Sequence, residues 1–283
     1  MLLNVCCWGE AHAKSIVCIH GLTQRGGVFG PLAERLAELS YRVVSVDLRG
    51  HGKSGHEPPW STERHVHDVL ETLNSLGVQR YTLIGHSFGG RVAAATAAAA
   101  AESTESLVLL DPGLEIPPQR ALQGAELDRL DWSFERPEGA INALLAGNGV
   151  IATSRDTVAA YVAEDVRKGS DGRYRFSFCP SAVVAAWSEM CLPAPPIATL
   201  PTLVVCVEGS LFTASLEERY RAGLSSLLSV VRVPNGHNVL WESAEETTEA
   251  VERFLRVGGP DSATVVDPLA AYIDDSGSLQ PLL

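Results

Sequence analysis

The sequence predicts an α/β fold, in which a mostly parallel sheet is covered by helices on both faces. Short apolar runs rich in β-branched residues, typical of strands, alternate along the chain with amphipathic helical patterns. The loops that join them are short, and several of the strand-like runs are apolar enough to be buried on both faces. This alternation favours βαβ units, and we therefore expect most strands to lie parallel.

The first part of the chain supplies this alternation in order. Pro31 lies in the first turn of a predicted helix, and Ser61 is a suitable cap for a second helix that stops at Gly77. The loop that begins at Asp47 is shaped by two glycines, so we expect Asp47 and His51 to brace the strand ends rather than to react. The strands of this part are predicted at 14–19, 41–46, 81–84 and 107–110.

The segment 81–101 predicts a strand, a sharp turn at Ser87 and an alanine-rich helix. Gly85 and Gly89 flank the serine at positions where a Cβ would collide with the neighbouring strand or helix. The turn exposes the Ser87 hydroxyl, and the N-terminus of the following helix directs backbone N–H groups at it. A Gly-x-Ser-x-Gly sequence also occurs in plain turns, but the strand before it, the helix after it and the extra Gly90 favour a nucleophile elbow.

Between residues 114 and 199 the strand patterns stop and helical patterns follow one another. A glycine-marked patch at 171–176 fits a short hairpin or a loop, and the prolines from Pro193 to Pro201 form a stiff return path. A block inserted at the ligand-binding ends of the strands would act as a cap. Its aromatic side chains are candidates for an apolar pocket wall, although most such side chains only pack a cap on a body. These candidates are Trp132, Phe134, Tyr161, Tyr174, Phe176, Phe178 and Trp187.

The sheet resumes after this block. Strand patterns at 202–207 and 229–233 enclose a helix at 216–224, and His237 follows on a glycine-containing loop. Ser243 caps a last helix that carries two glutamates in its first turn. From Gly258 onward Gly, Pro, Asp and Ser dominate and Lys and Arg are absent. We therefore expect a core formed by 1–113 and 200–257, a helical cap at 114–199 and a flexible tail at 258–283.

The charge balance excludes some partners. A formal net charge of -12, without clustered Lys and Arg, argues against a surface for nucleic acid or for an anionic membrane. No segment approaches the roughly 20 apolar residues of a membrane span, and the N-terminus lacks a basic segment followed by a long apolar stretch. We expect neither a span nor secretion, and the sequence carries no signal for the oligomeric state.

Cysteine and histidine spacing gives no metal site. The six cysteines lack metal-ligand spacing, and a pair of adjacent cysteines, Cys6 and Cys7, is unsuited to a disulfide, so we expect reduced thiols and a cytoplasmic protein. His65 and His67 lie two residues apart, which directs them to different faces of a helix, whereas a metal pair needs a spacing of three or four. We expect both to be solvated or lightly buried.

Four motifs together resemble the α/β-hydrolase superfamily over about residues 15–255. They are His20-Gly21, the loop Asp47-Leu48-Arg49-Gly50-His51-Gly52-Lys53-Ser54, the elbow Gly85-His86-Ser87-Phe88-Gly89-Gly90, and Gly236-His237. The resemblance implies a mainly parallel eight-stranded sheet, a cap after strand six, and a triad in the order serine, acid, histidine. It assigns Ser87 as nucleophile and His237 as general base, and the backbone N–H groups of Leu22 and Phe88 as the oxyanion hole.

The acid is the point at which this sequence departs from the family. Much of the family has an aspartate a few residues after a glycine beyond strand seven, but Glu208-Gly209-Ser210-Leu211-Phe212 has none. Asp111 follows the strand after the serine helix, a position that some members use for the acid, although many relatives carry a Leu-Asp-Pro turn there without using it. Glu208 at the end of strand seven is the alternative, and a chain without an acid is the third.

The chemistry that the resemblance implies is acyl transfer through Ser87. We expect a carboxylic-ester hydrolase that acts on small to medium, rather apolar molecules and needs no cofactor or metal. Haloalkane dehalogenases and epoxide hydrolases of this fold need an aspartate nucleophile, so a serine at this position argues against both. Hydrolysis of lactones or of carbon–carbon bonds is an alternative within the same chemistry. A non-catalytic small-molecule receptor is an alternative of another class, suggested by the missing strand-seven aspartate.

Overall fold

The structure is a computed structural model, and it describes residues 1–146 and 153–257. The predicted tail at 258–283 lies outside the described residues. No helix within the two described ranges is long and apolar enough to cross a membrane. In chain order the elements are β1 (Val5–Trp8), β2 (Lys14–Ile19), η1 (Gly26–Phe29), α1 (Gly30–Glu38), β3 (Tyr41–Val46), α2 (Thr62–Ser75), β4 (Tyr81–His86), α3 (Phe88–Ala99), β5 (Thr104–Leu110), α4 (Pro118–Asp128), β6 (Ser133–Phe134), α5 (Pro137–Ala146), α6 (Arg155–Asp165), β7 (Arg167–Lys168), β8 (Tyr174–Arg175), α7 (Pro180–Glu189), β9 (Thr202–Cys206), α8 (Ala214–Leu224), η2 (Ser225–Leu227), β10 (Leu228–Arg232), α9 (Val239–Glu242) and α10 (Ala244–Val257).

The main sheet of the described chain has seven strands in the order β1-β3-β2-β4-β5-β9-β10. Six of these strands run parallel to one another, and β1 alone runs antiparallel, against β3. The expected mostly parallel sheet is therefore confirmed. The count of eight is not confirmed: the described residues form seven strands of this sheet, and those before Lys14 contribute one, Val5–Trp8.

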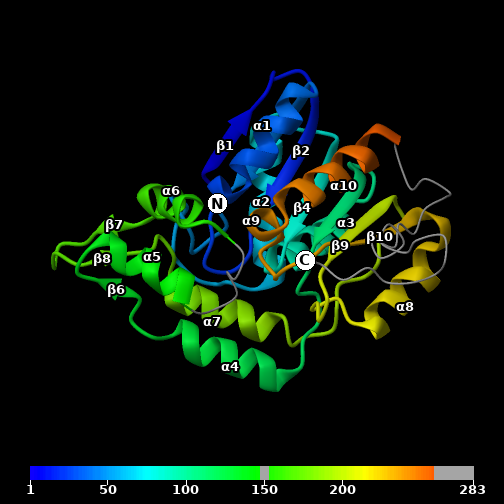
Figure 1. Ribbon diagram of the computed structural model, residues 1–283. Helices are drawn as coiled ribbons and strands as arrows, with labels where there is room; N and C mark the ends of the chain where they lie inside the picture. The colour runs from blue at the N-terminus through cyan, green and yellow to red at the C-terminus, as the bar shows by residue number, and fades with distance from the viewer. Residues whose placement is uncertain (147–152, 258–283) are drawn as a thin grey trace, which may run out of the picture.

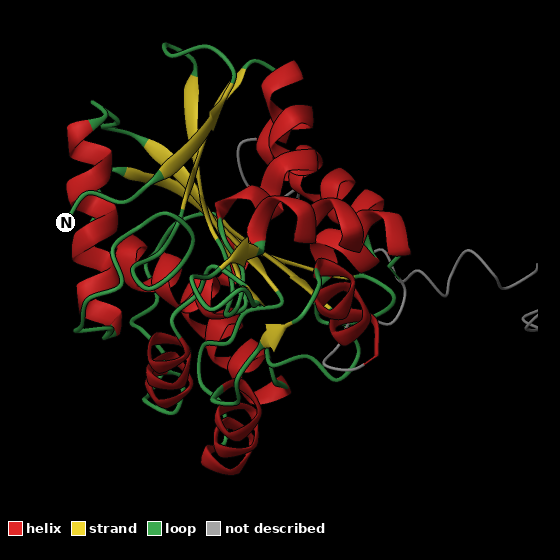
Figure 2. Cartoon of the chain, turned by 90° about the vertical axis from the view of Figure 1, so that its left-hand side faces the viewer, coloured by secondary structure: helices red, strands yellow, loops and turns green. Residues whose placement is uncertain are grey.

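Strand patterning explains why helices cover both faces (Figure 2). Val17 and Ile19 of β2 belong to one buried apolar cluster, whereas Ile16 and Cys18 belong to the other. Both sets are fully buried, as a parallel sheet requires. Helices α2, α3 and α8 contribute to the first cluster, and α1 and α10 to the second.

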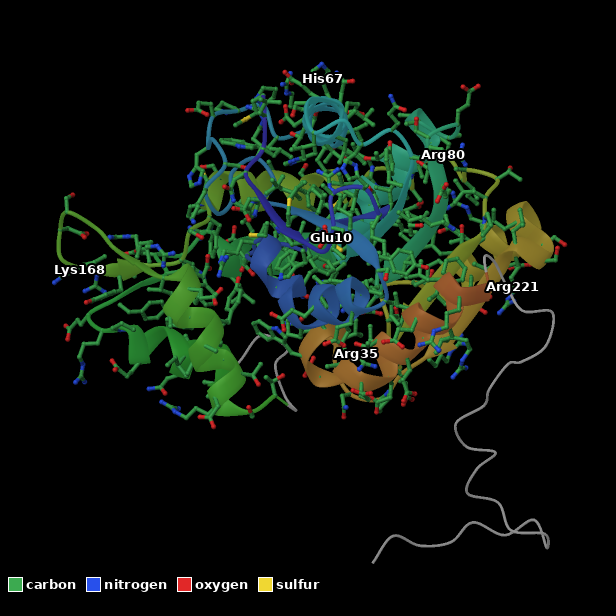
Figure 3. All side chains as sticks on the ribbon, turned by 90° about the horizontal axis from the view of Figure 1, so that it is seen from above. Glu10, Arg35, His67, Arg80, Lys168 and Arg221 are labelled. Atoms are coloured by element: carbon green, nitrogen blue, oxygen red, sulfur yellow. The ribbon has the colours of Figure 1, made fainter. Side chains whose placement is uncertain are left out.

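Residues 114–199 form an insertion between β5 and β9, which are neighbours in the sheet. In Figure 1 it is the mainly green lobe beside the body, and Lys168 marks its outer end in Figure 3. It follows the fifth strand of the observed sheet rather than a sixth. It is also not purely helical, because its described part holds a small antiparallel sheet, β6-β8-β7, beside helices α4 to α7. The glycine-marked patch at 171–176 supplies β8 of this sheet.

Backbone contacts join the insertion to the body next to the carboxyl ends of the strands. Gly52 N donates to Ser177 O at 2.6 Å, and Cys179 N donates to Gly50 O at 2.7 Å. Gly50 has φ of +85°, and a Cβ there would lie 2.4 Å from the Ala182 side chain. Only glycine meets both conditions, so this loop glycine permits the close approach of the insertion.

Candidate active site

Ser87 occupies the turn between β4 and α3. Its backbone has φ 54° and ψ -121°, a conformation that costs energy for any residue with a side chain. Close packing holds it: a Cβ on Gly85 would lie 2.3 Å from Gly89 O, and one on Gly89 would lie 2.1 Å from Ile19 O. Ser87 N also donates to Leu110 O at 3.0 Å. The expected elbow geometry is therefore present, with the hydroxyl at the N-terminus of α3.

Asp111 lies directly after β5, in the strand adjacent to the serine strand. It is 1 % exposed and has φ 39°. Its Oδ1 accepts a short hydrogen bond from the Ser210 hydroxyl and a longer one from Val207 N at 3.4 Å. Burial alone would raise the pKa of Asp111, but hydrogen bonding and charge from His237 outweigh burial and lower it. The side chain is therefore an ionised acceptor at neutral pH.

His237 joins these two residues. Its Nδ1 lies 2.5 Å from Asp111 Oδ2 and its Nε2 lies 2.8 Å from Ser87 Oγ. Because a carboxylate only accepts, Nδ1 carries the proton, and Nε2 is left to accept the serine hydroxyl. The side chain is 40 % exposed, so packing alone does not fix it.

The loop that carries His237 is tied to helix α9. Asn238 N donates to Glu242 Oε2 at 2.9 Å, and a Cβ on Gly236 would lie 2.5 Å from the same carboxylate. Asn235 has φ of 68° and its Nδ2 donates to Glu242 O at 2.6 Å. The loop is thus held from its C-terminal side by residues of a short helix that the sequence patterns did not indicate.

Glu208, the alternative acid, lies elsewhere. It is exposed in the turn after β9, and no hydrogen bond joins it to His237 in the described part of the chain. The structure brings Asp111, and not Glu208, to the imidazole.

The chain after β2 forms the opposite wall of the site. Leu22 lines the same cavity as Ser87, and a Cβ on Gly21 would lie 3.0 Å from Ser87 Cβ. His20 is buried below this loop: its Nδ1–H donates to Gly21 O at 2.7 Å and its Nε2 accepts from Leu48 N at 2.9 Å. Burial lowers the pKa of His20, in agreement with this neutral tautomer. Phe88, the other expected amide donor, is the first residue of α3 and has no intrahelical acceptor for its N–H.

A cavity of about 360 Å³ opens over Ser87 and His237. Of the seven aromatic residues expected in the pocket wall, five line it: Trp132, Tyr161, Phe176, Phe178 and Trp187. Phe134 and Tyr174 do not, and Phe134 instead packs edge-on behind Phe176 with centroids 6.1 Å apart. Trp241, four residues after His237, also lines the cavity and was missed. Its closeness to His237 along the chain was the available signal.

Two charged residues of α4 face this apolar cavity. Asp128 accepts a hydrogen bond from Trp187 Nε1 at 2.7 Å, and a Cβ on Gly124 would lie 2.5 Å from the same indole. Trp187 is therefore clamped against α4. Arg120, two turns earlier, lines the cavity, and its guanidinium makes no ion pair or hydrogen bond with any described residue.

The loop after β3 has the bracing role expected for it. Asp47 accepts hydrogen bonds from Gly26 N at 2.8 Å and from Lys53 N at 2.9 Å. His51 is 1 % exposed and its ring packs edge-on against His20. Burial lowers the pKa of His51 well below its ordinary value, so it stays neutral.

One group of possible metal ligands occurs in the described residues: His67, Asp68 and Glu71. Asp68 already pairs with Arg49 and Arg64, and the Met1 amino group bonds both carboxylates. Figure 3 shows His67 on α2 at the outer surface, as expected. His65 was expected to be solvated or lightly buried, but it is 1 % exposed and packs against the Phe88 ring, because α2 lies on α3. Cations of the chain itself satisfy this acidic group.

Comparison with known proteins agrees with this geometry. A model described as the alpha/beta hydrolase family matches residues 16–250. The chain is 31 % identical over 215 residues to lipase LipV of Mycobacterium tuberculosis, covering 74 % of this chain and 79 % of that protein. It is 25 % identical over 258 residues to esterase YbfF of Escherichia coli, covering 85 % and 92 %. The crystal structure of E-2-(acetamidomethylene)succinate hydrolase superimposes with a TM-score of 0.78 at 26 % identity, over 90 % of this chain and 95 % of that one.

Proposed function

This chain belongs to the alpha/beta hydrolase family, and from that premise we propose that it is a serine hydrolase that cleaves carboxylic esters of small to medium apolar substrates. Similar proteins named lipase and esterase support the hydrolase class. The observation that carries the proposal is the His237 imidazole, which contacts Ser87 Oγ through one nitrogen and Asp111 through the other.

The first step is formation of an acyl-enzyme. His237 Nε2 takes the hydroxyl proton as Ser87 Oγ attacks the ester carbonyl, and Asp111 stabilises the imidazolium through Nδ1–H. His237 then gives that proton to the alcohol that leaves. The short path from Oγ to Nε2, 2.8 Å, is what this transfer needs.

The oxyanion of the tetrahedral intermediate needs hydrogen-bond donors that face the former carbonyl oxygen. The N–H groups of Leu22 and Phe88 fill this role, and the N-terminal end of α3 adds its dipole. Hydrolysis follows when His237 activates water, which attacks the acyl carbon and releases Ser87. Preorganised donors of this kind are worth about 10²–10³ in turnover each.

The insertion acts as a cap that supplies the substrate wall. Its aromatic side chains and Trp241 make most of the cavity over Ser87 apolar, which favours apolar acyl or alcohol groups. A cavity of about 360 Å³ suits a small or medium molecule.

Replacement of Ser87 by Ala tests the proposal. We expect Ser87→Ala to remove p-nitrophenyl ester turnover by at least about 10⁴-fold while its thermal unfolding stays like that of the wild type. A fluorophosphonate should label the wild type and not the variant. Turnover retained in Ser87→Ala would refute the serine mechanism.

A second candidate is hydrolysis of an ester or amide in a substrate that carries a carboxylate. Arg120 favours it, because this exposed residue lines the cavity and forms no ion pair or hydrogen bond with a described residue. The similar E-2-(acetamidomethylene)succinate hydrolase acts, by its name, on a succinate derivative. A panel of neutral esters, acidic esters, acidic amides and lactones separates the candidates. If Arg120→Gln lost activity on the acidic substrates alone, this would favour the second candidate.

The contact between Asp111 and His237 supports the enzyme over a non-catalytic receptor, the alternative suggested by the missing aspartate after strand seven. A receptor predicts that a fluorophosphonate leaves Ser87 unlabelled.

A further inference from the structure

A buried polar cluster lies beside the reacting side chains, and His86 and Gln24 line the same cavity as Ser87. His86, the residue before Ser87, is 2 % exposed, and Gln24 is 9 % exposed. His86 Nε2 lies 3.0 Å from the main-chain oxygen of His237, and its Nδ1 lies 3.0 Å from Gln24 Oε1. The mechanism described above uses neither residue.

Gln24 extends this cluster to the two flanking loops. Its Oε1 accepts from Gly21 N at 3.1 Å, and its Nε2 donates to Asn238 Oδ1 at 3.3 Å. One imidazole and one carboxamide therefore connect the loop after β2, the serine elbow and the loop that carries His237. These three segments are far apart in the sequence.

Both oxygens that face the His86 ring, the main-chain oxygen of His237 and Gln24 Oε1, only accept. Burial, followed by the charge of the nearby His237, lowers the pKa of His86 to about 3, so the ring is neutral near pH 7 and has a single N–H. Gln24 Oε1 already accepts from Gly21 N, so we place the hydrogen on Nε2, which donates to His237. Nδ1 then lies beside Gln24 Oε1 without a hydrogen bond between them.

The reacting histidine needs such support. Its side chain is 40 % exposed, and it must stay within hydrogen-bond distance of Ser87 and Asp111 at the same time. The bonds to Glu242 hold the loop from the C-terminal side. Within the described residues, the bond from the His86 side chain holds the main-chain oxygen of His237.

We propose that His86 is a positioning residue, which holds His237 against Ser87 by donating its Nε2–H to the main-chain oxygen of His237, while Gln24 ties the loop after β2 to Asn238. This inference rests on the proposed function of Ser87 and His237. It gives the residue inside the Gly-His-Ser motif a role in the geometry of the reaction, distinct from the steric role of the two glycines.

The test compares His86→Leu, which lacks the donor, with His86→Gln, whose side-chain N–H can reach the same oxygen. Displacement of a reacting group by about 1 Å can cost about 10²-fold in rate. We expect His86→Leu to lower kcat per folded molecule by about 10- to 100-fold with KM within about 3-fold, and to slow fluorophosphonate labelling equally. His86→Gln should recover most of the loss.

His65→Leu is the matched control. It replaces another histidine that is 1 % exposed, on α2, with no contact to His237. If burying leucine in place of histidine had a general effect, kcat per folded molecule would fall alike in both variants. Thermal unfolding of each protein gives its folded fraction at the assay temperature, and each rate is divided by that fraction. Equal rates per folded molecule in wild type and His86→Leu, or failure of His86→Gln to recover, would overturn the proposal.

Hydrogen exchange of the 234–239 backbone separates this proposal from the proposed function. We expect these amides to exchange about 10-fold faster in His86→Leu and near the wild-type rate in His86→Gln. Faster exchange in a protein whose Ser87 never reacts would leave the positioning contact supported and refute the hydrolase. Unchanged exchange would refute the positioning role whatever the activity.

Discussion

The body and the insertion contribute different things to one cavity. The body supplies Ser87, Asp111 and His237, each next to the carboxyl end of a strand and each held by hydrogen bonds of the main chain or of buried groups. The insertion supplies rings, of which Trp132, Phe176 and Phe178 pack on one another, while Trp187 is also held by Asp128. Hydrogen bonds fix positions more narrowly than apolar contacts do.

Under the proposed function, this difference predicts that reaction chemistry and substrate choice are separable in this molecule. Changes in the body should alter the rate for every substrate by a similar factor. Changes in the insertion should alter the ratio of rates between substrates and leave the reactivity of Ser87 nearly constant. Single substitutions in either region test this division.

Asp111→Asn should break the chemistry of the body. An amide in place of the carboxylate cannot stabilise the imidazolium and favours the wrong tautomer, so we expect kcat to fall by about 10²–10⁴-fold with little change in KM. Glu208→Gln is the control and should stay within about 2-fold, because Glu208 is exposed and away from His237. Steady-state kinetics on one ester measures both. A larger loss in Glu208→Gln would contradict the assignment of the acid.

Arg25→Met should loosen the contact between the two regions. Arg25 follows the loop of Leu22, and its Nε lies 3.2 Å from Asp165 of α6, whose side chain is 2 % exposed. Removing the cation leaves that buried carboxylate with the Ser177 hydroxyl as a donor but without its opposite charge, and breaking a buried ion pair typically costs about 3–5 kcal/mol. Urea unfolding measures the loss.

Glu164→Gln is the control for the ion pair. Glu164 also contacts Arg25, but its side chain is 71 % exposed, so its removal should cost less than about 1 kcal/mol. If this contact makes body and insertion unfold as one unit, the wild type should show one urea-unfolding transition. Arg25→Met should show two, because the two regions then unfold separately. A single unshifted transition in Arg25→Met would contradict the role of the contact.

Trp187→Ala should change substrate choice without changing the chemistry. Loss of the indole clamped by Gly124 and Asp128 enlarges the cavity, so we expect the ratio of kcat/KM for octanoate over butyrate esters to rise about 10-fold. Fluorophosphonate labelling of Ser87 should change by less than about 3-fold. Phe134→Leu, behind the wall, should leave the ratio unchanged. Equal loss for both esters would mean that the wall also positions the reacting groups.

Asp128→Asn should give the smallest effect, on stability alone. Burial raises the pKa of Asp128 above its ordinary 3.8, and the hydrogen bond from Trp187 opposes this without cancelling it. The folded protein therefore holds this proton more tightly than the unfolded chain, and stability falls as pH rises from 3.8 through the raised pKa. Asn keeps the acceptor without the charge. We expect Asp128→Asn to unfold at a temperature about 2–4 °C higher near pH 8, for a gain of about 1 kcal/mol, and to match the wild type near pH 3.

How far the sequence predicts this molecule depends on how local each feature is. The elbow was predicted because its strand, glycines, serine and helix are consecutive, and local sterics decide the geometry. The choice between Asp111 and Glu208 was left open because both follow neighbouring strands. It depends on the backbone at each strand end: Asp111 turns below His237 with φ 39°, whereas Glu208 lies two residues past β9, in solvent.

Tertiary packing decided the features that were missed. Strand β1 is short, half-buried and antiparallel, so it lacks both the apolar run and the helical neighbour that marked the other strands. His65 was expected to be solvated or lightly buried and is fully buried, because its helix packs on α3. The pocket wall was predicted only as a set of seven rings, since the fold of the insertion decides which of them face Ser87.

Three of the five tryptophans of this protein, Trp132, Trp187 and Trp241, lie in the cavity wall. The intrinsic fluorescence of the chain is therefore weighted towards this one place. An apolar molecule that displaces water there should shift the emission to shorter wavelength, while Trp8 and Trp60 give a constant background. Titration of the Ser87→Ala variant would then report affinity for intact esters without a chromogenic group, and could screen candidate molecules before any turnover is sought.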